Sequence, residues 1–124
     1  MKVYIAGPYT KGDVVLNVRW AILIADQVLE RGHVPYVPHL THFWHLLVPH
    51  TWETWLALDL EWLRDCDVVL RLPGESVGAD LEVAEALKLG IRVVYRIEDL
   101  SLNPPGVDLW QECKDAGEIE EAAV

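Results

Sequence analysis

The chain has 124 residues, of which 52% are hydrophobic and 24% are charged, enough for one compact core and too few for two ordinary domains. Twenty acidic against ten basic side chains leave a formal charge of -10, which argues against binding to nucleic-acid polymers and anionic membranes. Two cysteines at unrelated spacing offer no disulfide framework, and no segment reaches the ~20 apolar residues that span a bilayer. We therefore expect a cytoplasmic protein, in which a local pocket can still bind a small phosphorylated ligand.

The N-terminal part alternates a short apolar run with a longer helical pattern. Residues 3–6 are typical of a buried strand, and apolar residues at helical spacing predict a helix from about residue 13 to 30. Gly32 follows this helix and favours its termination. The face of the helix expected to point inward comprises Val14, Val15, Val18, Ala21, Ile22, Ala25, Val28 and Leu29.

The middle of the chain predicts an edge strand, a crossing segment and a second helix. Residues 33–37 resume extended structure, and Pro35 indicates an edge position because it lacks a backbone donor. Residues 38–50 are neither periodic enough for a helix nor polar enough for a loop, so we expect a partly buried crossing segment. Thr51 can cap a helix that runs to about residue 64. Its expected inward residues are Trp52, Trp55, Leu56, Trp62 and Leu63.

The following segment completes an alternating β and α order. Residues 67–72 predict a third strand, residues 78–89 a third helix and residues 91–95 a fourth strand. This order with short links predicts an α/β flavodoxin-like open parallel sheet of four or five strands, with helices on both faces. We expect strand order 2-1-3-4.

The C-terminal part differs in character from the rest. Residues 1–98 form the expected domain, and residues 99–124 form an acidic extension that begins with a linker-like turn. A short helix is expected from about Leu109 to Lys114, followed by frayed residues.

Two glycine-containing loops mark the expected ligand site. In an open parallel sheet, ligands bind beyond the carboxyl ends of the strands where strand order reverses, which here means the loops 7–12 and 73–78. Both loops lead into helix N-termini, whose free amides favour an anion. Tight turns alone also explain the glycines. The sequence contains neither the phosphate-binding motif of nucleoside triphosphatases nor the dinucleotide fingerprint.

Asp59 and Glu82 are the candidate catalytic carboxylates. Asp59 interrupts the apolar stripe of its helix, so it is paired, protonated or facing a pocket, or else it is a structural carboxylate. Glu82 lies one turn into the third helix among small residues, where an ordinary helix-start role is the alternative. Two carboxylates converging on one cleft are what cleavage at a glycosidic carbon requires.

Four histidines and four tryptophans have weaker functional interpretations. His39, His42, His45 and His50, with Glu53, form a metal site only as a minor alternative to packing, because their spacing matches no known zinc motif. The tryptophans between residues 44 and 62 indicate a core or a subunit seam, so we expect a homodimer or homotetramer.

The motifs YIAGP at 4–8, DLEWL at 59–63 and SVGADLE at 76–82 resemble the nucleoside 2-deoxyribosyltransferase-like superfamily over most of residues 2 to 95. The central stretch is similar to the 2-deoxynucleoside 5'-monophosphate N-glycosidases. The resemblance implies that Glu82 is the nucleophile at the anomeric carbon and that Asp59 assists base departure. It further implies that Tyr4 orients Glu82 and Tyr9 sandwiches the base.

The resemblance implies cleavage of a nucleoside or nucleotide N-glycosidic bond, by hydrolysis or 2-deoxyribosyl transfer, with no cofactor and no metal. Ser76 and free amides favour a 5'-monophosphate weakly. The remaining expected substrate-binding residues are Gly7, Pro8, Thr10, Lys11 and Gly78. A non-catalytic nucleotide-binding module of the same fold is the alternative.

Overall fold

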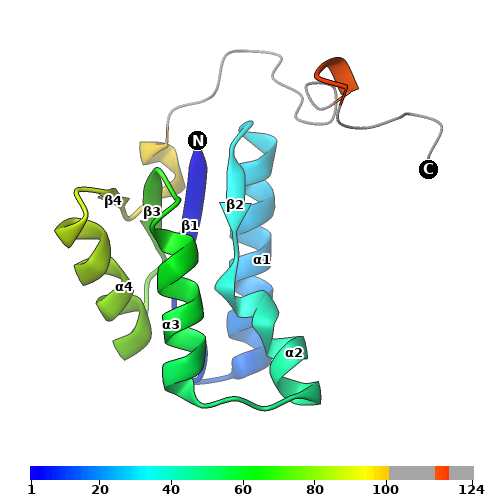
Figure 1. Cartoon of the computed structure of the whole chain (residues 1–124), viewed down its shortest axis with the longest axis vertical. Coiled ribbons are helices and arrows are strands. Elements are labelled where there is room, and N and C mark those ends of the chain that lie inside the picture. Colours follow the sequence, from blue (N-terminus) through cyan, green and yellow to red (C-terminus); the bar gives the residue numbers. More distant parts are fainter. Residues whose placement is uncertain (101–113, 118–124) are drawn as a thin grey trace.

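The computed structural model describes residues 1–100 and 114–117, and in them four parallel strands form one sheet (Figure 1). Its strands are β1 (Lys2–Ala6), β2 (Val34–Tyr36), β3 (Val68–Arg71) and β4 (Arg92–Val94). They lie in the order β2-β1-β3-β4, and every pairing is parallel. The predicted α/β class and strand order are therefore confirmed, with the proline-containing strand β2 at an edge.

Side-chain caps begin the three longer helices, α1 (Val14–Glu30), α3 (Trp52–Leu63) and α4 (Val77–Lys88). The residue before each helix accepts a hydrogen bond from a backbone N–H of the first turn, which has no partner within the helix. The capping residues are Asp13, Thr51 and Ser76. Gly32, which follows α1, has a φ of 84°, a conformation that residues with a Cβ rarely adopt.

Residues 38–50 are more regular than the sequence predicts. A 3-10 helix, η1 (Pro38–Leu40), leads directly into α2 (Thr41–Leu47). None of the α2 residues is buried, so the helix has no inward apolar stripe that a sequence pattern can reveal. The expectation of a non-helical crossing segment is therefore wrong.

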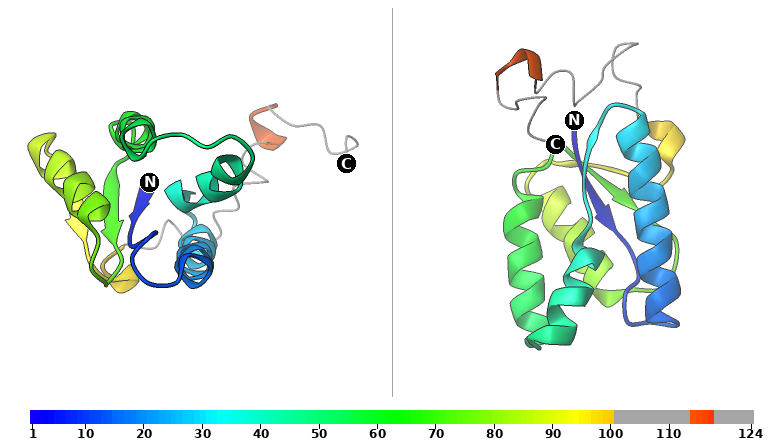
Figure 2. Two further views of the ribbon diagram at one scale, coloured as in Figure 1. Left: turned by 90° about the horizontal axis from the view of Figure 1, so that it is seen from below. Right: turned by 90° about the vertical axis from the view of Figure 1, so that its right-hand side faces the viewer.

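The two faces of the sheet bury different clusters of side chains. Val3 and Ile5 of β1 pack in a cluster with the inward residues of α1, while Tyr4 and Ala6 pack with residues of α3 and α4. The alternation follows from the two-residue period of a strand. Figure 2 shows α1 on one side of the sheet and α3 and α4 on the other, as expected for helices on both faces.

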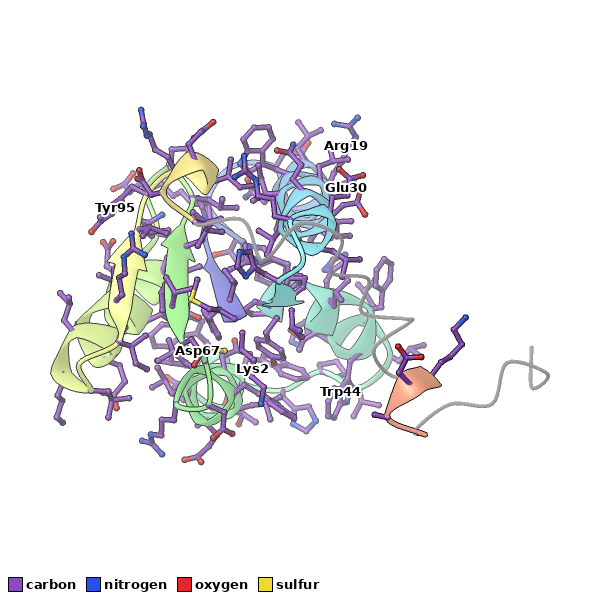
Figure 3. All side chains as sticks on the ribbon, turned by 90° about the horizontal axis from the view of Figure 1, so that it is seen from above. Lys2, Arg19, Glu30, Trp44, Asp67 and Tyr95 are labelled. Atoms are coloured by element: carbon purple, nitrogen blue, oxygen red, sulfur yellow. The ribbon has the colours of Figure 1, made fainter. Side chains whose placement is uncertain are left out.

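The inward face of α1 is narrower than predicted. Its buried residues are Val18, Ala21, Ala25 and Val28. Val15, Ile22 and Leu29 are exposed, because the sheet contacts only one narrow stripe of the helix. Figure 3 shows Arg19 and Glu30 on the side of α1 turned away from the sheet.

The tryptophans of α3 differ from expectation in the same way. Trp52 and Trp62 are half-exposed, and Leu63 is the residue of this helix that is fully buried. Trp44 of α2 is also half-exposed and points away from the sheet (Figure 3). These side chains do not form the core, so the interpretation as core residues is wrong.

The structure describes little of the C-terminal extension. The helix expected from Leu109 to Lys114 lies outside the described residues except for Lys114, and so does most of the expected frayed end. A last 3-10 helix, η2 (Ile97–Asp99), precedes the extension. Every helix in the described part of the chain is too short or too polar to cross a membrane.

Candidate active site

A pocket of about 390 Å³ lies at the carboxyl ends of β1 and β3, bordered by both glycine-containing loops and by α2, α3 and α4. Most of the residues singled out from the sequence line it, namely Gly7, Tyr9, Thr10, Lys11, Asp59, Ser76, Gly78 and Glu82. Tyr4 and Pro8 do not line the pocket: Tyr4 contacts Glu82, and Pro8 lies beside Gly74 of the second loop. The fold thus brings together side chains from three separate segments of the chain.

Glu82 is buried in the first half of α4 and faces the pocket. The hydroxyl of Tyr4, from the middle of β1, donates a hydrogen bond to Glu82 Oε2. Burial raises the pKa of Glu82 to about 8, because the charged carboxylate loses its hydration. Tyr4 lies where it can hold the orientation of Glu82.

Asp59 lies in the middle of α3 and also faces the pocket. Burial raises its pKa to about 7, although a hydrogen bond from the Tyr36 hydroxyl to Oδ1, at 3.4 Å, acts in the opposite direction. Tyr36 is the last residue of β2 and was not identified as a site residue from the sequence. Only the pairing of β2 with β1 brings it near Asp59, so no local sequence pattern signals it.

A side-chain amide fixes the loop after β1. Asn17 Nδ2 donates hydrogen bonds to the carbonyl oxygens of Tyr9 and Lys11, at 2.9 and 2.8 Å. The Tyr9 hydroxyl and His42 Nδ1 lie 2.6 Å apart, which joins this loop to α2. Lys11 forms an exposed ion pair with Glu75 across the pocket mouth, at 3.4 Å.

The two glycine-containing loops pack directly against each other. Gly74 has a φ of 116°, and a Cβ added there would lie 2.7 Å from Pro8 Cγ. Arg71 donates hydrogen bonds to the carbonyls of Leu72 and Gly74 and to Asp80 Oδ1, which fixes the path of the chain into α4. Glycine at position 74 is therefore required both for the turn and for the close approach to Pro8.

The first turn of α4 presents backbone amides beside Lys11. Ser76 Oγ accepts a hydrogen bond from Ala79 N at 3.1 Å, and residues 76–79 line the pocket. N–H groups in the first turn of a helix have no intrahelical acceptor, so they favour an anionic or strongly accepting group.

The histidines pack with aromatic residues rather than around a common point. His39 Nε2 lies 2.9 Å from the carbonyl oxygen of Pro8, and His45 Nδ1 accepts hydrogen bonds from Trp55 Nε1 and from His50 N. Burial lowers the pKa of His39, although hydrogen bonds to the backbone carbonyls of Pro8 and Gly7 act in the opposite direction. Within residues 1–100 and 114–117, no three His, Cys, Asp or Glu side chains are arranged to hold a metal ion.

The arrangement places two carboxyl groups of raised pKa on one pocket that also contains a phenol, backbone amides and aromatic walls. A carboxyl group that keeps its proton near neutral pH can act as a general acid, and a second, once ionised, can act as a nucleophile. Perturbed carboxyl groups in a cleft are typical of functional sites.

Comparison with known proteins places the fold. No curated protein matches the chain significantly. A solved structure of the 2-deoxyribosyltransferase from the psychrotolerant bacterium Bacillus psychrosaccharolyticus is similar with a TM-score of 0.55 and 18% identity, covering 98% of this chain and 94% of that chain. This similarity supports the flavodoxin-like α/β fold. The model of a domain of unknown function, DUF7768, matches residues 1–96, and the chain therefore belongs to the DUF7768 family.

Proposed function

We propose that the protein cleaves the N-glycosidic bond of a nucleoside, deoxynucleoside or corresponding 5'-monophosphate, with hydrolysis or transfer of the sugar to another base. The observation that carries the proposal is the pair of carboxyl groups on one pocket, buried Glu82 and partly buried Asp59, whose pKa values are both raised by burial. The similarity of the fold to a 2-deoxyribosyltransferase adds support.

In the first step, ionised Glu82 attacks the anomeric carbon of the sugar. The bond between that carbon and the base nitrogen breaks, its electron pair goes to the base, and Asp59 gives its proton to the base. A water molecule or a second base then attacks the anomeric carbon and gives up a proton to Asp59, while the bond between that carbon and Glu82 breaks and Glu82 leaves as a carboxylate. Tyr4 holds Glu82 through its hydroxyl in both steps.

The remaining pocket residues bind the substrate. Tyr9 stacks on the base, and Pro8 supports the loop of Tyr9 through its contact with Gly74. The first turn of α4, with Ser76 and Gly78, receives the 5' end of the sugar. Lys11 reaches the same end by exchanging its exposed ion pair with Glu75 for the substrate.

The test is to incubate the protein with deoxynucleosides and with their 5'-monophosphates and to measure free base by chromatography. We expect base release that Glu82→Gln lowers by at least about a thousandfold, since an amide is not a nucleophile. Glu85→Gln is the matched control, because this glutamate also lies in α4 but is not among the residues that line the pocket and pairs with Arg64 instead.

Base release that survives in Glu82→Gln would refute the assignment of the nucleophile. Binding of nucleotides without any base release would favour the non-catalytic binding module instead. A preference for monophosphates over nucleosides that Lys11→Met removes would support the proposed 5' subsite.

A further inference from the structure

The two pocket carboxyl groups have matching support from the sheet. Tyr4 and Tyr36 are partners in the parallel pairing of β1 and β2, and their ring centroids lie 5.5 Å apart. Tyr4 donates to Glu82, and Tyr36 donates to Asp59. The carboxyl groups line the pocket and the tyrosines do not, so each tyrosine contacts its carboxyl group from the side of the sheet.

We propose that Tyr36 is a positioning residue for Asp59. The Tyr36 hydroxyl binds Oδ1 of Asp59 from the side of the sheet and leaves Oδ2 to face the substrate. This inference rests on the proposed function, because it describes how the general acid of that reaction is oriented.

The direction of the hydrogen bond decides which oxygen of Asp59 carries the proton. Because Oδ1 accepts the Tyr36 hydroxyl, the proton of the neutral acid resides on Oδ2. During cleavage the Oδ2–H bond breaks and the proton forms a bond with the base nitrogen, which receives the electron pair of the glycosidic bond. Asp59 becomes a carboxylate whose charge the Tyr36 hydroxyl stabilises.

The ring of Tyr36 is held independently of its hydroxyl. It stacks on Trp62 of α3 with ring centroids 5.5 Å apart and also packs against the ring of Tyr4. A phenylalanine at this position can therefore keep both ring contacts and lose only the hydrogen bond. This separation makes the proposal testable without removing the packing.

Few ionisable groups lie near this pair, which simplifies a titration. Tyr36 is close to Asp59 and to Cys66. Burial raises the pKa of the Cys66 thiol to about 11, so this thiol stays neutral near pH 7. The pocket that Asp59 lines also contains Glu82 of α4 and the groups at its mouth. Those groups are Lys11 and Glu75. His39, which is buried, and His45 and His50 also line the pocket.

The experiment compares the wild-type protein with Tyr36→Phe. Its first readout is the pKa of Asp59 from carbon NMR of the side-chain carboxyl, with Asp59→Asn used to identify the signal. Loss of a hydrogen bond to the charged form should raise this pKa further. Its second readout is base release, in which kcat should fall about tenfold while KM changes little. The alkaline limb of the pH profile should move to higher pH.

Tyr95→Phe is the matched control. Tyr95 is exposed beyond β4, on the opposite side of the molecule from Trp44, so this variant should leave the pKa and kcat unchanged (Figure 3). A lower melting temperature in Tyr36→Phe with the pKa of Asp59 and kcat unchanged would overturn the proposal, because Tyr36 would then be merely structural.

The two readouts separate this inference from the proposed function. A raised pKa of Asp59 in a protein that releases no base would support the contact and refute the reaction. Base release that requires Glu82, together with a pKa of Asp59 that Tyr36→Phe does not move, would overturn the inference alone.

Discussion

The two sides of the sheet differ in what they bury. On the α1 side, Val3 and Ile5 belong to a cluster of buried apolar side chains, and we call this face the dry side. On the side of α3 and α4, Tyr4 carries a hydroxyl into the interior and meets the buried carboxyl group of Glu82. One strand thus contributes to both a stabilising face and a polar face.

The difference indicates how so small a domain can hold ionisable groups in its interior. Burying Glu82 and Asp59 disfavours their charged forms, which lowers stability wherever they must ionise. The α1 side has no such cost and supplies apolar burial that offsets it. Substitutions on the two sides should therefore affect different properties.

The largest expected effect on stability comes from truncating the dry side. Ile5→Ala should lower the free energy of unfolding by about 2–5 kcal/mol, because Ile5 is fully buried and leaves a cavity. Tyr4→Phe, one residue away, should cost only about 1 kcal/mol, yet slow base release by about 10- to 100-fold through the loss of its bond to Glu82. Denaturant titration and base release, measured on both variants, check this pair. Equal losses of stability would contradict the contrast between the faces.

A smaller effect is expected from pH, and it should arise on the side of α3 and α4. The pKa of Glu82 is about 8 in the folded protein against an ordinary value of 4.5, so the folded state binds more protons between these limits. Asp59 acts in the same direction up to about pH 7. Stability should therefore fall as pH rises from about 4.5 to 8, by at least about 5 °C in melting temperature.

The control for this dependence is Glu82→Gln, which removes the group with the larger shift. Its melting temperature should change less between pH 5 and 8 than that of the wild-type protein. A wild-type melting temperature that rises over this window would show that other groups dominate.

Base release should have a bell-shaped pH profile. The reaction requires the form in which Glu82 is ionised and Asp59 keeps its proton, so a single proton remains on the pair. Because Glu82 has the higher pKa, this reactive form is the minor one of the two singly protonated forms. With both pKa values between about 7 and 8, activity should be highest near this interval and fall on either side.

The parts of the fold that could be predicted are those encoded locally. Buried strands appear as short apolar runs, and the turn residues around Gly32 and the cap at Thr51 mark helix ends. The helix α2 could not be predicted, because none of its residues is buried and its apolar side chains follow no inward stripe.

The candidate site divides in the same way. Asp59 could be found because a carboxylate interrupts an apolar helix face, and Glu82 because small residues surround it after a glycine-containing loop. Tyr36 and His42 could not be found, since their contacts depend on strand pairing and on a helix that the sequence does not signal. Asn17 could not be found either. Its two hydrogen bonds go to backbone carbonyls, and any polar residue in a first helical turn can make such bonds, so the residue type alone gives no signal.

The smallest expected effect on stability concerns the outer surface of the α1 side, which is apolar as well. Leu16, Trp20 and Leu23 of α1 are all exposed. A surface of this kind favours self-association. The homodimer or homotetramer expected from the tryptophan content stays a prediction, and this surface is one place to test it. Trp20→Lys should shift the protein toward the monomer in light scattering at micromolar concentration, while the stability of the monomer changes by only about 0.5 kcal/mol.

Leu87→Lys is the matched control, because Leu87 is an exposed residue of α4 on the other side of the sheet. A wild-type monomer, or equal dissociation by both variants, would show that the outer surface of α1 is not the interface.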